Sequence, residues 1–160
     1  MIYLLDTNII SETIKKSPNK IVLDWLSSID VNQCALSVLT LGEIRKGAEM
    51  LESRPKKHNL IQWLEIDLLK QFYGRIIYID AQVADKWGYI CSFINKSDKI
   101  LAVDTLIAAS AIVHNLKLVT RNTKDFQEIS GLDRSSRFNY QLMVTDNITN
   151  KPFLSVKQFC

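Results

Sequence analysis

The chain has 160 residues, of which 47% are hydrophobic and 23% charged, as expected for one soluble globular domain. Its three scattered cysteines fit neither a disulfide framework nor a zinc site, so we expect free thiols and a cytoplasmic location. No apolar stretch is long enough to span a membrane and no basic flank marks a signal peptide, while the formal charge of +3 permits a nucleic-acid partner without requiring one.

Short apolar runs alternate with amphipathic segments along the chain. The apolar runs predict strands at residues 2–5, 33–36, 76–79 and 116–119, with a weaker candidate at 141–145. Helices are predicted at residues 9–16, 20–28, 38–52, 57–73, 81–94 and 103–113. Apolar spacing places Ile21 and Leu51 on the buried faces of the second and third helices. This alternation predicts an α/β fold with a mostly parallel sheet.

Asp6 directly follows the first predicted strand. The carboxyl end of a strand is where open α/β sheets place their ligand crevice. Asp6, Thr7 and Asn8 precede or begin a predicted helix, and aspartate and asparagine are favourable helix N-caps. For Asp6 alone, a helix cap is therefore the commoner alternative to a functional carboxylate.

Three other acidic residues occur near helix starts or beside apolar helix faces. Glu43 lies beside the apolar stripe of the third helix, Asp104 opens a helix that is apolar almost all round, and Asp125 follows Asn122 by three residues. Each has a structural alternative, namely an exposed residue at the edge of the core, a charge favoured by a helix N-terminus, and a capping-box partner.

The predicted topology brings these carboxylates toward one another. In a parallel sheet the ends of the first and fourth strands lie on the same edge, so we expect Asp6 and Asp125 to converge, with the helix start at Asp104 nearby. Thr120 and Asn122 are expected in the same crevice. Clustered carboxylates repel one another unless a cation binds, and hard oxygen ligands suit Mg²⁺ or Mn²⁺. Such a site favours attack of a metal-activated hydroxide on a phosphodiester.

Four motifs resemble those of the PIN-domain ribonucleases, and especially the VapC-type toxins of bacterial toxin–antitoxin pairs. The motifs are Leu-Leu-Asp-Thr-Asn at 4–8, Leu-Gly-Glu-Ile-Arg-Lys-Gly at 41–47, Asp-Thr-Leu-Ile-Ala-Ala at 104–109 and Leu-Val-Thr-Arg-Asn-Thr-Lys-Asp-Phe at 118–126. The resemblance covers residues 1–132, and residues 133–160 form an extension unlike the family's usual ending, with room for a last strand and a tail.

This resemblance implies an α/β/α PIN fold with four or five strands and a metal-dependent endoribonuclease activity. It assigns the catalytic metal site to Asp6, Glu43, Asp104 and Asp125. Hydrogen-bonding support is assigned to Thr7, Asn8, Thr120 and Asn122. It also implies Mg²⁺ or Mn²⁺ as cofactor, structured RNA such as tRNA as substrate, a homodimer, a cognate antitoxin, and operator DNA reached only through that antitoxin.

Arg45 and Lys46 follow Glu43 on the same predicted helix, and their charges make them candidates for binding RNA phosphates. A solvated helix end is the alternative. Two other functions also remain open. One is a binding module that sits on an antitoxin and aids operator repression with little catalysis of its own. The other is a phosphotransfer enzyme, although its usual second acid is replaced by Asn8 and a glycine-rich phosphate loop is absent.

Overall fold

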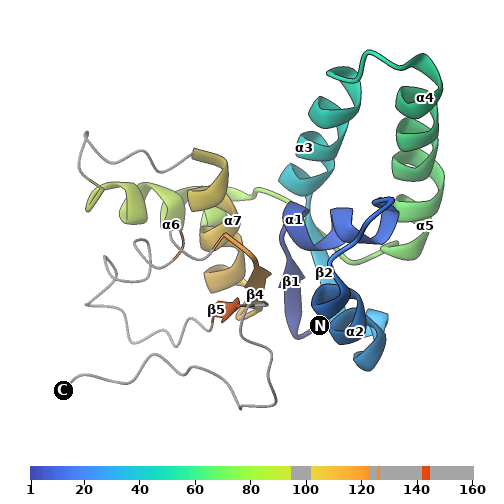
Figure 1. The fold of residues 1–160 in the computed structure, drawn as a ribbon. Helices are drawn as coiled ribbons and strands as arrows, with labels where there is room; N and C mark the ends of the chain where they lie inside the picture. Colours follow the sequence, from blue (N-terminus) through green and yellow to red (C-terminus); the bar gives the residue numbers. More distant parts are fainter. Residues whose placement is uncertain (95–101, 123–125, 127–141, 145–160) are drawn as a thin grey trace.

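A single parallel sheet organises the computed structural model, which describes residues 1–94, 102–122, 126 and 142–144 (Figure 1). Its five strands, in the order β3-β2-β1-β4-β5, are β1 (Tyr3–Leu5), β2 (Cys34–Ser37), β3 (Ile76–Ile77), β4 (Lys117–Thr120) and β5 (Leu142–Val144). Every pairing is parallel, so all strands end at the same edge. This confirms the predicted α/β architecture, and the weak candidate at 141–145 supplies the last strand.

Helices cover both faces of the sheet (Figure 1). On one face, α6 (Ala81–Cys91) packs against α7 (Ala102–Val113). The other face carries α1 (Thr7–Ile10), the 3₁₀ turn η1 (Ser11–Ile14), α2 (Lys20–Ser28) and α3 (Val38–Glu49). The following helical segment packs along α3. It consists of α4 (Arg54–Gln62), the π-helical segment η3 (Trp63–Leu68) and α5 (Leu69–Gln71). A short 3₁₀ turn, η2 (Val31–Gln33), precedes β2.

The strands are buried on both sides, and successive residues serve two different cores. Leu4 and Leu118 pack with α6 and α7, whereas Leu5 and Val119 pack with α1, α2, α3 and η3. All four side chains are almost completely buried. Because side chains alternate across a strand, a strand between two helical layers needs apolar residues at every position. This explains why the strands were predictable as continuous apolar runs.

Polar side chains cap the N-termini of α1, α2, α3 and α6. A backbone N–H donates to the side chain of each of four caps, Asp6, Asn19, Ser37 and Asp80. Pro55 lies in the first turn of α4, where the N–H that proline lacks would have no partner within the helix.

Two residues predicted to be buried are exposed, so these predictions were wrong. Ile21 is 45% exposed, because Val22 and Trp25 occupy the inward side of α2. Leu51 is 37% exposed, because α3 ends at Glu49 and the chain turns away before the next helical position can reach the core. In the part of the chain that the structure describes, no helix combines the length and apolar character needed to cross a membrane.

Candidate active site at the carboxyl edge of the sheet

Asp6 lies at the end of β1, where β1 and β4 run side by side. Its backbone N–H donates to the carbonyl oxygen of Val119 at 3.0 Å. Its carboxylate Oδ1 accepts a hydrogen bond from the Thr7 N–H at 2.7 Å, while Oδ2 accepts from Asn8 Nδ2 at 2.6 Å and Thr120 Oγ1 at 2.5 Å. Asp6 is therefore both the cap of α1 and a carboxylate whose two oxygens are held in fixed positions.

Glu43 joins this carboxylate from α3. The hydroxyl of Thr7 donates a hydrogen bond to Glu43 Oε2, so Thr7 contacts Asp6 through its backbone and Glu43 through its side chain. Burial raises the pKa of Asp6 above its usual value and the negative charge of Glu43 raises it further, while hydrogen bonds from Thr120, Thr7 and Asn8 partly oppose the shift. A fixed, buried carboxylate beside a second acid favours a proton or a cation.

Asp104 occupies the first turn of α7 and is 8% exposed. Its charge is favoured there by the helix N-terminus. Among the described residues, however, no three His, Cys, Asp or Glu side chains form a group that could hold a metal ion. The structure thus joins Asp6 with Glu43 but does not gather Asp104 into a ligand group with them. Asp125 lies outside the described residues, so its place in the site stays a prediction.

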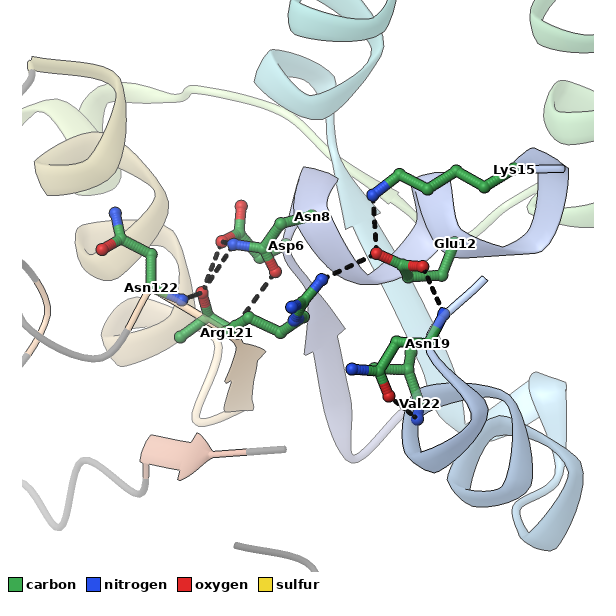
Figure 2. A network of polar contacts seen from close by, with 9 residues as sticks. Asp6, Asn8, Glu12, Lys15, Asn19, Val22, Arg121 and Asn122 are labelled. Atoms are coloured by element: carbon green, nitrogen blue, oxygen red, sulfur yellow. Dashed lines mark hydrogen bonds and ion pairs between the residues drawn. The ribbon is translucent and has the colours of Figure 1, made fainter. Parts of the chain in front are cut away.

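The predicted supporting residues Asn8 and Asn122 lie beside Asp6 (Figure 2), and both donate hydrogen bonds to Thr120. Thr120 Oγ1 accepts hydrogen bonds from Asn8 Nδ2 at 3.0 Å and from the Asn122 N–H at 2.9 Å. Asn8 Oδ1 accepts from the backbone N–H of Arg121 at 3.0 Å. The structure therefore brings Thr7, Asn8, Thr120 and Asn122 together around Asp6, with Asn122 contributing its backbone N–H.

Two charged residues for which the sequence analysis predicted no role, Glu12 and Arg121, lie beside this network (Figure 2). Glu12, in η1, is only 2% exposed, and its Oε1 accepts hydrogen bonds from Lys15 Nζ at 2.6 Å and Arg121 Nη1 at 2.8 Å. Its Oε2 accepts from the Asn19 N–H at 2.7 Å. A signal was present in the sequence, because Glu12 follows Ile9 by three residues and thus falls on the apolar side of its helical segment.

Burial alone would raise the pKa of Glu12. Hydrogen bonds from Lys15 and Asn19, together with the positive charges of Lys15 and Arg121, outweigh burial and lower that pKa. Glu12 and Asp6 are thus two buried carboxylates with opposite tendencies. The partners of Glu12 stabilise its ionised form. Burial and the charge of Glu43 destabilise the ionised form of Asp6, which favours binding of a proton or a cation there.

The predicted substrate-binding residues, Arg45 and Lys46, lie on the exposed surface of α3. Arg45 Nε donates to Glu49 Oε1 at 2.9 Å and its Nη1 donates to Glu65 Oε1 at 2.7 Å. Arg45 therefore ties α3 to η3 in this structure. Substrate binding by Arg45 and Lys46 stays a prediction.

Comparison with known proteins identifies the family. The PIN domain signature matches residues 3–132. Toxin FitB of Neisseria gonorrhoeae is 40% identical over 124 residues, which cover 77% of this chain and 89% of that protein. VapC ribonuclease Y4jK of Sinorhizobium fredii is 30% identical over 131 residues, covering 81% of this chain and 93% of that protein.

A solved structure is also similar over most of its length. FitAB bound to an IR36 DNA fragment superimposes with a TM-score of 0.73 at 36% sequence identity, covering 81% of this chain and 91% of that chain. The signature spans most of the chain, and the relatives are matched over most of their own length. The chain therefore belongs to the PIN-domain family, as its motifs predict, and is similar to the VapC-type toxins of that family.

Proposed function

We propose that this protein is a metal-dependent endoribonuclease that hydrolyses RNA phosphodiester bonds and acts as the toxin of a toxin–antitoxin pair. The observation that carries the proposal is the Asp6 carboxylate, which is buried at the sheet edge, fixed by three hydrogen-bond donors and placed beside Glu43. The resemblance to a protein named as a VapC ribonuclease supports RNA as the substrate class, and structured RNA such as tRNA is the substrate we propose.

The residues at this edge suit Mg²⁺ or Mn²⁺. Asp6 and Glu43 would hold the ion, because two carboxylates joined through Thr7 offer the oxygen ligands that these cations prefer. Asp104 and Asp125 are the further ligands we propose. When bound, such an ion supplies a Lewis acid and a water of lowered pKa.

This chain's own residues orient the carboxylates. Thr120 and Asn8 hold one oxygen of Asp6 and the Thr7 N–H holds the other, so the carboxylate plane cannot rotate freely. The Thr7 hydroxyl fixes Glu43 at the same time. Such outer partners commonly decide both metal affinity and activity.

A cognate antitoxin protein and a second copy of this chain are the protein partners we propose. The likeness to a protein named as a toxin supports an antitoxin, and the DNA bound to FitAB supports a role at operator DNA. In our proposal this chain reaches that DNA only through its antitoxin. A catalytically weak subunit that mainly binds the antitoxin is the second candidate function.

Incubation of the purified protein with a total tRNA pool tests the proposed activity. We expect fragments in the presence of Mn²⁺ or Mg²⁺, their loss with EDTA, and their loss in Asp6→Ala, because that variant lacks the central carboxylate. Gel analysis of the RNA is the measurement. If a folded, metal-supplied protein cuts no tRNA, a narrower RNA target or the antitoxin-binding role takes precedence.

Arg45→Ala tests the predicted contact with substrate. We expect weaker RNA binding at low salt and a smaller deficit as salt rises, because a lost phosphate contact reduces the release of counterions. The ion pairs of Arg45 are exposed and screened by solvent, so their loss should change the stability of the fold little. Filter binding across a salt series measures the effect, and equal binding at every salt concentration would remove Arg45 from the substrate site.

A further inference from the structure

We infer that the ion pair between Glu12 and Arg121 is a positioning element, which holds the Asn8 and Thr120 side of the site against the Asp6 carboxylate. Its consequence for catalysis rests on the proposed ribonuclease function. Its structural part does not, because it concerns only how the end of β4 is fixed against α1. Glu12 binds the side chain of Arg121, the Arg121 N–H binds Asn8, and Asn8 and Thr120 bind Asp6, so we infer that the ion pair acts through Asn8 and Thr120.

Glu12 joins its own turn to the start of the next helix and to the end of β4, which is 109 positions away in sequence. It lies in η1, its carboxylate accepts the N–H of Asn19 just before α2, and it accepts Nη1 of Arg121 just after β4. Glu12 is only 2% exposed, and a charge buried to this extent is tolerated only when it is paired and hydrogen-bonded. The fixed anion therefore fixes the position of Arg121.

Arg121 transmits this position to the site through its backbone. Its N–H donates to Asn8 Oδ1 at 3.0 Å, which leaves Asn8 Nδ2 to donate to both Asp6 Oδ2 and Thr120 Oγ1. The opposite orientation of the Asn8 amide would place Nδ2 against the Arg121 N–H and Oδ1 against the carboxylate of Asp6. Arg121 therefore selects the orientation of Asn8 that supports Asp6.

The same hydrogen bonds determine which acceptor receives the hydroxyl proton of Thr120. Because Thr120 Oγ1 accepts from Asn8 Nδ2 and from the Asn122 N–H, its own proton is directed to Asp6 Oδ2. Arg121 lies between the two β4-end residues that make these bonds. Displacing Arg121 should loosen Asn8, Thr120 and Asn122 together.

Lys15 provides a matched control for the charge of Glu12. Its Nζ binds the same Glu12 oxygen as Arg121, but its side chain is 49% exposed and extends from η1 instead of the end of β4. A purely stabilising role for Glu12 predicts similar effects from removing either cation. A positioning role predicts that only Glu12 and Arg121 influence the site.

The experiment compares Glu12→Gln, Arg121→Met and Lys15→Met in the full-length protein. Amide exchange by NMR measures the N–H groups of residues 121 and 122, with those of Leu118 and Val119 in β4 as internal references. We expect faster exchange at 121 and 122 in the first two variants only. We also expect their kcat for RNA cleavage to fall about 10- to 100-fold with KM near the wild-type value, as for other outer partners of a metal site.

Arg121→Lys adds a conservative variant. It should restore part of the amide protection and part of kcat, because lysine keeps the charge but not the planar guanidinium. It also keeps the test decisive if Glu12→Gln does not fold. Unchanged exchange at 121 and 122 in the folded variants would overturn the inference, and so would faster exchange with an unchanged kcat. Equal effects of Lys15→Met and Arg121→Met would overturn it as well.

The two proposals can fail separately. If the wild-type protein cleaves no RNA, the proposed function fails, while the exchange of residues 121 and 122 still decides whether Glu12 and Arg121 fix the end of β4. If the wild-type protein cleaves RNA and exchange in the variants is unchanged, the ribonuclease stands and the positioning element does not.

Discussion

Asp6→Asn should abolish RNA cleavage while leaving the protein folded. The substitution removes the negative charge at the centre of the site, and even partners outside a metal's ligand shell contribute about 10- to 100-fold to activity, so we expect a loss of at least about 100-fold. Asparagine is as good a helix cap as aspartate and keeps the acceptor for the Thr7 N–H. Because burial and Glu43 raise the pKa of Asp6, loss of its charge should offset part of the lost hydrogen bonding.

Single-turnover cleavage and thermal unfolding followed by circular dichroism measure the two effects of Asp6→Asn. Asp24→Asn, an exposed position on α2, is the matched control and should behave like the wild type in both assays. Cleavage at the wild-type rate would reduce Asp6 to a helix cap. Loss of the folded state would assign it a mainly structural role.

Glu12→Gln should lower the free energy of unfolding at pH 7 by about 1–3 kcal/mol, since it weakens a buried acceptor of three hydrogen bonds. Removing one member of a fully buried ion pair costs about 3–5 kcal/mol. The smaller value applies here because the side chains of Arg121 and Lys15 are 35% and 49% exposed and thus partly screened by solvent.

This difference between Glu12→Gln and the wild type should depend on pH. The pKa of Glu12 is lower in the folded state than its unfolded value near 4.5, so folding favours the ionised form. The stabilising contribution is therefore fully present above pH 4.5 and is lost as the pH falls through the lowered folded-state pKa. Asp6, whose pKa is raised, has the opposite dependence, but it is common to both proteins and cancels in their difference.

Urea unfolding of the wild type and Glu12→Gln at pH 7 and at a series of acidic pH values measures this effect. Glu65→Gln is the control, because Glu65 is 56% exposed and solvent screens its ion pair with Arg45, so this substitution should change stability little. A difference for Glu12→Gln that stays constant down to the lowest pH would show that ionisation of Glu12 is not its source.

Much of the fold and part of the site could be predicted because the signals are local. The strands between two helical layers are apolar at consecutive positions, and their ends are marked by polar residues such as Asp6 and Thr120. Parallel pairing of β1 with β4 then places these two residues at the same edge, and the structure confirms that they are hydrogen-bonded. The parallel pairing of β1 with β4 thus brings the motifs at residues 4–8 and 118–126 together in one site.

The remaining features depend on contacts that no local pattern specifies. Glu12 and Arg121 are 109 positions apart, and only the folded sheet brings their charges together. The ion pair of Arg45 with Glu65 likewise depends on the packing of the π-helical segment η3 against α3, while the predicted role of Arg45 in substrate binding stays a prediction. The exposure of Leu51 depends on where α3 ends, and helix ends are the least reliable feature of an apolar pattern.

The pairing of β1 with β4, which comes late in the sequence, has a consequence during synthesis of the protein. A nascent chain that has not yet released Thr120 from the ribosome contains Asp6, Thr7 and Glu43 but lacks the hydroxyl that holds Asp6 Oδ2. Parallel strands joined by long connections also pair late in folding. An unfinished or prematurely terminated copy that lacks Thr120 therefore cannot complete the hydrogen-bonded site around Asp6.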